Sequence, residues 1–167
     1  MPPASLHPFV LHYAIALLVV GPALDLAGLL LRRESLLLAG RWNTILGAVA
    51  LLLTVLSGLS TEAGLGAHSA AGASLLALHK AAGLLALAVW VPVAVWRTAS
   101  KQALPLRART VYLSLAFAGA ALLLIQAALG SALVYWHGVG LSPQARAEPL
   151  PRNGKGDKAP ADRALSR

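Results

Sequence analysis

Five histidines are the residues of this chain whose type and position could do chemistry, because imidazole is a common ligand of metals and haem iron. They are His7, His12, His68, His79 and His137. Each lies near one end of a long apolar stretch, and four such stretches would bring all five to the same side of a membrane. Ionisable side chains in membrane segments are rare and costly, so each is a candidate functional residue. The sequence therefore predicts a shared histidine site at one membrane face.

The elements that must position these histidines are four apolar stretches, each near or above the ~20 helical residues that span a bilayer. The chain has 57% hydrophobic and 12% charged residues, whereas a soluble domain has roughly 25% charged residues. We expect an all-α fold, a four-helix transmembrane bundle over residues 1–140, with a disordered basic tail over residues 141–167. The expected spans cover residues 8–31, 42–60, 74–96 and 110–136.

Basic residues set the expected orientation of the bundle. Residues 32–41 and 97–109, in the first and third loops, contain several arginines and a lysine, whereas residues 61–73 in the second loop contain neither. The positive-inside rule then makes the two basic loops cytoplasmic and places both termini outside. The basic tail conflicts with this assignment, but a tail after the last span tests the rule weakly. The histidines are therefore expected near the periplasmic face.

Depth and helical phase indicate which histidines could share a ligand. At ~1.5 Å per residue, His12 and His79 lie ~11 Å and ~9 Å above the bilayer centre. Gly83 follows His79 by one turn, and Gly130 lies at about the same depth, on one stripe of the fourth helix with His137. Such a site would suit a porphyrin held edge-on between helices. We therefore expect haem b, bound non-covalently because the chain has no cysteine, with His12, His79, Gly83, Gly130 and His137 as the cofactor-binding residues.

Two other hypotheses remain open. A transition metal could bind at an outer site made of His7, His68 and His137, since imidazole suits zinc, copper and nickel, and the protein would then bind or transport metal. Alternatively, the chain binds no cofactor and is a non-catalytic accessory subunit of a larger membrane complex, with glycine stripes that allow close helix packing. The sequence contains no hydrolase or transferase motif and no basic face suited to nucleic acid, so the only enzymatic role considered is that of a redox subunit.

Three charged residues near or within the spans have structural interpretations beside functional ones. Asp25 lies in the cytoplasmic half of the first helix, where it would pair with Arg41, Arg97 or the arginines of the first loop, or else serve as a proton-path carboxylate. Glu62 is interpreted as a solvated or cap-associated charge. Lys80, beside the expected site, is interpreted as snorkelling outward.

Three segments carry a resemblance to a bacterial family of membrane proteins, domain of unknown function 2231 (DUF2231). The opening LHPFVLHYAIALLVVGPALDL resembles the start of the family, with His-Pro at His7, a second histidine at His12 and an aspartate at Asp25. The segments SGLSTEA and LLALHKAAG resemble its passage from the second to the third helix, which includes His79. The ending ALGSALVYWHGVGL resembles its fourth-helix signature, which includes His137.

This resemblance covers roughly residues 6–141, and its last motif is the most specific. One departure is Tyr13-Ala14, where the family usually has an aromatic residue followed by proline, so the entry into the first helix differs. Membership implies four helices in a prokaryotic inner membrane, and relatives fused to cytochrome-type or Rieske-type modules imply a redox setting. The leading hypothesis is an integral membrane b-type haem protein that transfers electrons at the periplasmic face, with a quinone in the lipid bilayer or a periplasmic redox protein as partner.

Single-cysteine labelling tests the topology, because the chain has no native cysteine. Cysteines introduced at Ser5, Ser69 and Ser142 should react with a membrane-impermeant reagent in intact cells. Cysteines introduced at Ser35 and Ser100 should not react. Labelling at Ser35 but not at Ser69 would invert the protein and move the histidine site to the cytoplasmic face.

Overall fold

A computed structural model describes residues 3–65, 69–100 and 106–141. All four long helices are long and apolar enough to cross a membrane. The predicted all-α, four-helix membrane fold is therefore confirmed for the part of the chain that the structure describes. The elements are α1 (Pro3–Leu31), α2 (Glu34–Thr61), the short 3₁₀ helix η1 (Glu62–Gly64), α3 (Ala70–Ala99) and α4 (Leu106–His137).

The helices extend beyond the expected spans, most clearly at the start of α2. This helix begins at Glu34, because residues 34–41 include three leucines, an alanine, a glutamate and an arginine, all strong helix formers, which outweigh Gly40. Only Arg32, with a left-handed φ of 53°, and the extended Arg33 separate α1 from α2. Arg41, expected in a loop, therefore lies within α2, where its guanidinium donates a hydrogen bond to the Thr98 carbonyl at 3.0 Å.

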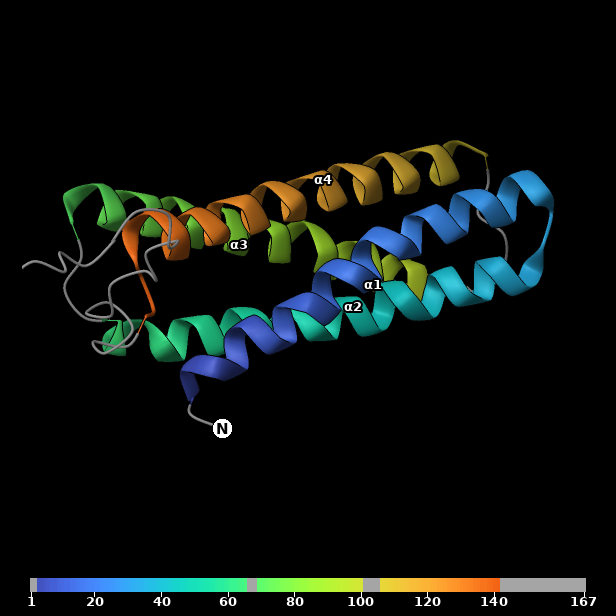
Figure 1. The fold of residues 1–167 in the computed structure, drawn as a ribbon. Coiled ribbons are helices and arrows are strands. Elements are labelled where there is room, and N and C mark those ends of the chain that lie inside the picture. The colour runs from blue at the N-terminus through green and yellow to red at the C-terminus, as the bar shows by residue number, and fades with distance from the viewer. Residues whose placement is uncertain (1–2, 66–68, 101–105, 142–167) are drawn as a thin grey trace, which may run out of the picture.

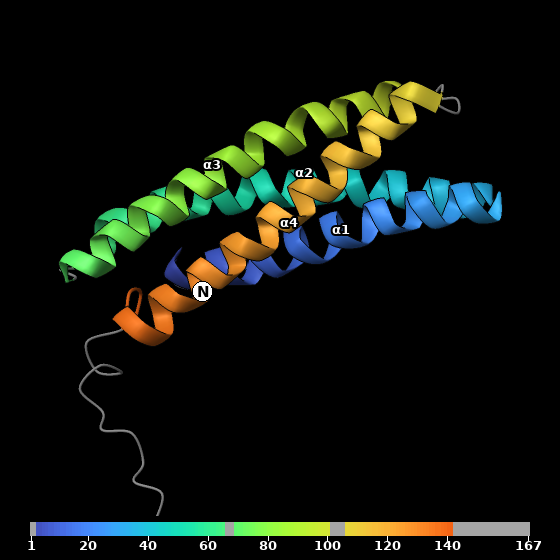
Figure 2. The ribbon, with the colours of Figure 1, turned by 90° about the horizontal axis from the view of Figure 1, so that it is seen from above.

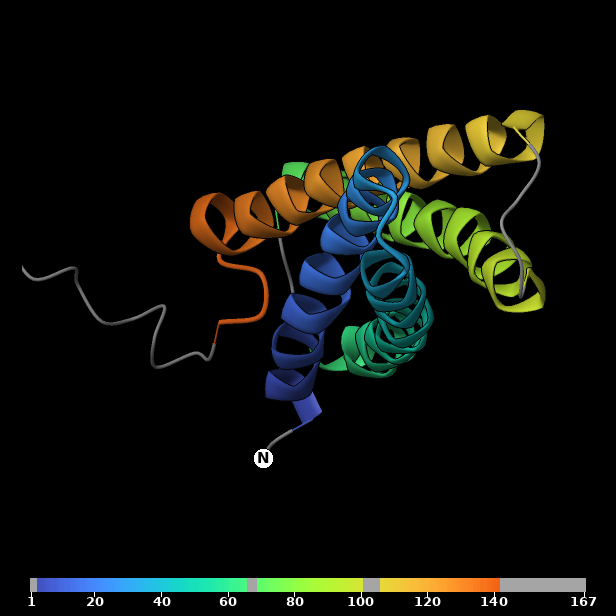
Figure 3. The same cartoon turned by 90° about the vertical axis from the view of Figure 1, so that its right-hand side faces the viewer.

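The four helices run up and down in turn and form a ring. α1 packs most extensively on α2 and α3 on α4, and the pairs α2–α3 and α1–α4 close the ring. The α3–α4 pair lies over the α1–α2 pair (Figure 1), and the two views at right angles show the helices crossing at an incline (Figures 2 and 3). We call one end of the bundle the histidine end, where α1 and α3 begin and α2 and α4 end. The opposite end is called the Asp25 end.

Glycines allow α1 and α2 to pack closely. A Cβ atom added at Gly47 would lie 2.6 Å from the Leu18 Cγ, and one added at Gly28 would lie 2.8 Å from the Leu37 Cδ2. Lipid tails are as apolar as leucine, so membrane helices gain little by hiding apolar surface from lipid and associate through close packing instead. The large side chain of one helix therefore fills the space that the glycine of its neighbour leaves.

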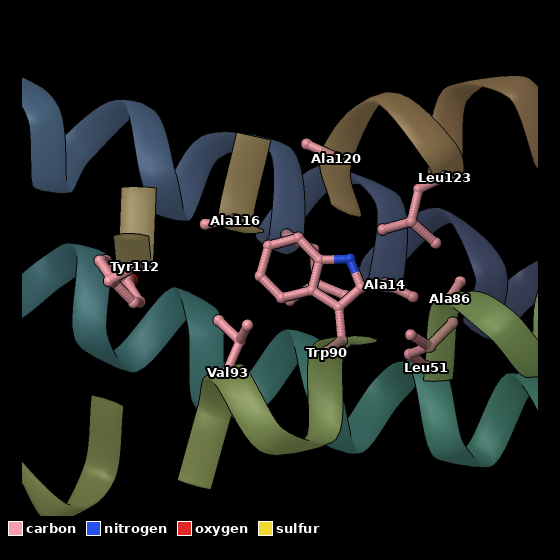
Figure 4. Close-up of a cluster of buried hydrophobic side chains, with 10 residues drawn as sticks. Ala14, Leu51, Ala86, Trp90, Val93, Tyr112, Ala116, Ala120 and Leu123 are labelled. Carbon is pink, nitrogen blue, oxygen red and sulfur yellow. The ribbon is translucent and has the colours of Figure 1, made fainter. Parts of the chain in front are cut away.

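The centre of the bundle is filled by Trp90 of α3, which is fully buried (Figure 4). Its indole packs against α4 at Gly119, where a Cβ atom would lie 2.9 Å from the Trp90 Nε1. Small residues from three helices leave room for this large ring. The buried cluster consists of Ala14, Leu18, Leu51, Ala86, Trp90, Val93, Tyr112, Ala116, Ala120 and Leu123.

Gly47→Ala is expected to lower the free energy of unfolding by about 1–3 kcal/mol, because the added methyl overlaps Leu18 and forces α1 away from α2. Gly64→Ala is the matched control, since a Cβ atom there meets nothing within 4 Å. Thermal unfolding of the purified protein in detergent, followed by circular dichroism, measures both effects. Equal melting temperatures for the two variants would contradict this account of the packing.

Candidate histidine site

A cavity of about 590 Å³ lies at the histidine end and is lined by residues from all four long helices. Most of its lining residues are apolar, and a few polar side chains converge on it. Among these are two histidines from α1, one from α3 and a glutamine from α4. They are His7, His12, His79 and Gln126.

The cavity brings together four of the five predicted cofactor-binding residues. His12, His79, Gly83 and Gly130 all line it. The fifth, His137, is the last residue of α4 and is not among the lining residues. His7, which the sequence assigned to an alternative metal site, joins the first group instead. His68, another member of that alternative site, lies outside the described residues.

Hydrogen bonds fix the ring nitrogens of the two α1 histidines. The Nδ1 of His7 lies 2.8 Å from the Thr54 carbonyl oxygen of α2. The Nδ1 of His12 is hydrogen-bonded to the Pro8 carbonyl oxygen of its own helix. A carbonyl oxygen only accepts, so Nδ1 must carry the proton in both rings. In the neutral imidazole this leaves the Nε2 lone pair free to bind a metal.

His7 and His79 each lie on a glycine of a neighbouring helix. A Cβ atom added at Gly58 of α2 would lie 2.9 Å from the His7 Cε1, and one at Gly130 of α4 would lie 3.1 Å from the His79 Cε1. Both histidines also line the cavity. The glycines therefore allow both imidazoles to enter the seams between helices beside the cavity.

An ion pair forms part of the cavity wall. The Lys80 Nζ lies 2.6 Å and 2.7 Å from the two carboxylate oxygens of Glu62, and both residues line the cavity. Lys80 was expected to snorkel outward and Glu62 to be a solvated or cap-associated charge, and Glu62 is indeed the C-cap residue of α2; their contact with each other was not expected. With side chains 38% and 40% exposed, such a pair contributes about 0–1 kcal/mol to stability. It neutralises two charges beside the histidines.

A second polar cluster lies at the Asp25 end. Asp25 is 2% exposed and accepts hydrogen bonds from the Arg97 Nε at 3.2 Å, the Arg97 Nη2 at 2.8 Å and the Tyr112 hydroxyl at 2.6 Å. Arg97 Nη2 also donates to the Leu37 carbonyl at 2.8 Å. The predicted pairing of Asp25 with Arg97 is confirmed. Because three donors satisfy this carboxylate, the geometry favours its structural interpretation over a proton path.

Sequence reasoning missed Tyr112 as a partner of Asp25. The available signal was a hydroxyl-bearing residue within the fourth span, at the end where the first span carries its aspartate. The phase of α4 relative to α1 was needed to connect the two, and that phase depends on the packing of the whole ring.

Arg97→Met should lower the free energy of unfolding by about 3–5 kcal/mol, because it leaves the Asp25 carboxylate buried without its counter-charge. The double variant Asp25→Leu with Arg97→Met removes both charges and should recover a substantial part of that loss. Thermal unfolding in detergent compares the two variants. A double variant as unstable as the single one would show that the unpaired charge is not the cause.

Comparison with known proteins identifies the family. A family model described as predicted membrane protein (DUF2231) matches residues 3–143, close to the region over which the sequence resembled that family. No curated protein and no solved structure matches the chain. The match spans all four helices and both polar clusters, and the chain is thus a multi-pass integral membrane protein that belongs to the DUF2231 family.

Proposed function

We propose that this protein binds haem b in the cavity at the histidine end, with His12 and His79 as axial ligands, and transfers electrons at the periplasmic face of the bacterial inner membrane. The observation that carries the proposal is that both histidines line one largely apolar cavity. Within it, the Nδ1 of His12 is committed to a backbone carbonyl. A backbone carbonyl acceptor of this kind commonly orients a ligating histidine and leaves its other nitrogen for the metal.

The number of donors favours haem over a bare metal ion. A structural or catalytic metal site in a protein normally takes at least three protein ligands. Among the described residues no three His, Asp or Glu side chains lie close enough together to hold an ion. Haem iron already has four nitrogen ligands from the porphyrin and needs only one or two from the protein. The histidines at this cavity therefore suit haem better than zinc, copper or nickel.

The cavity also has a suitable size and chemistry. Its volume of about 590 Å³ lies within the range of roughly 300–1,000 Å³ that is typical of small-molecule sites. Gly83 and Gly130 both line it, and they leave room for the Gln126 amide and the His79 imidazole at its wall.

The distribution of histidines indicates where electrons would enter and leave. A bound haem supplies one-electron oxidation and reduction. All five histidines belong to the half of the bundle assigned to the periplasmic side, so the chain offers no ligands for a second haem across the membrane. Electrons would therefore enter and leave on the same side, with a quinone in the bilayer or a periplasmic redox protein as partner.

The visible spectrum of the full-length protein, purified after expression with ample haem, tests the proposal. The wild type should show the Soret and α bands of haem b. His12→Ala and His79→Ala should abolish or strongly reduce them, because each removes an axial ligand. His137→Ala is the matched control and should retain them, since His137 does not line the cavity. A wild-type protein without these bands, or unchanged bands in His79→Ala, would refute the proposal.

His7→Ala distinguishes between two possible partners of His79. His7 lines the same cavity, and its Nδ1, like that of His12, is hydrogen-bonded to a backbone carbonyl. Loss of the bands in His7→Ala, with retention in His12→Ala, would reassign the second axial ligand to His7. Retention in His7→Ala is the expected result.

A further inference from the structure

His79 and Gln126 are arranged reciprocally across the seam between α3 and α4. His79 of α3 lies on Gly130 of α4, and Gln126 of α4 lies on Gly83 of α3, where a Cβ atom would be 2.6 Å from the Gln126 Nε2. His79 and Gly83 are four positions apart in α3, and Gln126 and Gly130 are four positions apart in α4. Four positions correspond to ~6 Å along the helix axis. The imidazole and the amide are therefore neighbours between two antiparallel helices.

Each of these side chains has a buried polar atom without a partner among the described residues. They are the His79 Nδ1 and the Gln126 Oε1. Gln126 as a whole is 5% exposed. A polar group that is buried in a membrane protein without a hydrogen bond destabilises the fold, because no water replaces the missing partner. The two residues face each other across the same seam, and one atom is a potential donor and the other an acceptor, so a hydrogen bond between them would satisfy both.

The geometry points to a positioning role: we propose that the Gln126 Oε1 accepts a hydrogen bond from the His79 Nδ1–H and thereby leaves the His79 Nε2 for the cavity. The amide can turn its oxygen toward the ring by rotation about its last side-chain bond, which hardly changes the shape of the group. All three cavity histidines then follow one rule. His7 donates from Nδ1 to Thr54 O, His12 donates to Pro8 O, and His79 donates to the Gln126 amide.

That the free Nε2 of His79 then binds haem iron rests on the function proposed above. A hydrogen bond to the second nitrogen of a ligating histidine fixes the ring and makes it a stronger electron donor. Gln126 would therefore influence the haem through His79 without touching the iron. The hydrogen bond itself does not need haem, so it can be tested separately.

Nitrogen-15 NMR of histidine-labelled, full-length protein in lipid nanodiscs without haem tests the hydrogen bond, since ring-nitrogen shifts separate the two neutral forms of imidazole. His79 is assigned by comparison with His79→Ala. The wild type should carry its proton on Nδ1. Gln126→Leu should lose this preference, and Gln126→Glu should retain it because a carboxylate also accepts. Asn43→Leu is the matched control, since the Asn43 amide donates to the Ala39 carbonyl and does not line the cavity.

Two results would overturn the inference. One is a wild-type His79 that carries its proton on Nε2. The other is a Gln126→Leu spectrum identical to that of the wild type. Should Gln126→Leu fail to fold, the wild-type spectrum and Gln126→Asn, which shortens the amide by one carbon and should weaken the preference, still decide the question.

With haem bound, Gln126→Glu should shift the midpoint potential to a more negative value than that of the wild type, because a carboxylate increases electron donation by the imidazole. Asn43→Leu should leave the potential unchanged. An unchanged potential in Gln126→Glu would contradict the link from Gln126 to the iron. Absence of haem from all preparations would refute the proposed function alone, because the NMR result does not depend on haem.

Discussion

The bundle depends on how closely the helix backbones approach one another, since burial of apolar surface gives membrane helices little reason to associate. Glycines make this approach possible, and several of them receive a side chain of the neighbouring helix. The same kind of contact packs the apolar core and the polar residues. The pairs are Leu18 on Gly47, Trp90 on Gly119, Asp25 on Gly40, His7 on Gly58, His79 on Gly130 and Gln126 on Gly83.

Features that depend on one helix at a time could be predicted from the sequence. Length and hydropathy identify the four helices, because a span must contain about 20 apolar residues whatever it packs against. The depth of a residue in the membrane follows from the rise per residue of the helix, and it correctly predicted that His79 and Gly130 lie at the same level. The charge of Asp25 in an apolar segment demanded a counter-charge, and Arg97 was among its expected partners. No contact within the described residues tests the haem cofactor or the orientation of the bundle in the membrane, so both stay predictions.

Features that depend on the relative rotation of helices could not be predicted. The position of Trp90 within the third span does not say which side of the helix faces the other helices, yet Trp90 fills the centre of the bundle. Prediction of the Glu62–Lys80 pair would have required the position of η1. Prediction of the hydrogen bond from Tyr112 to Asp25 would have required the register of α4 against α1. Such contacts join residues far apart in the chain, and periodicity within a helix does not specify them.

The ion pair between Asp25 and Arg97 has a consequence for how the bundle responds to the electrical potential across a membrane. Moving one elementary charge through 100 mV changes the energy by about 2.3 kcal/mol. The two opposite charges lie 2.8 Å apart and so occupy nearly the same level of the field, where their contributions cancel. Any motion that keeps them together does almost no electrical work. The Asp25–Arg97 pair therefore holds two charges within the bundle with almost no net coupling to the membrane potential.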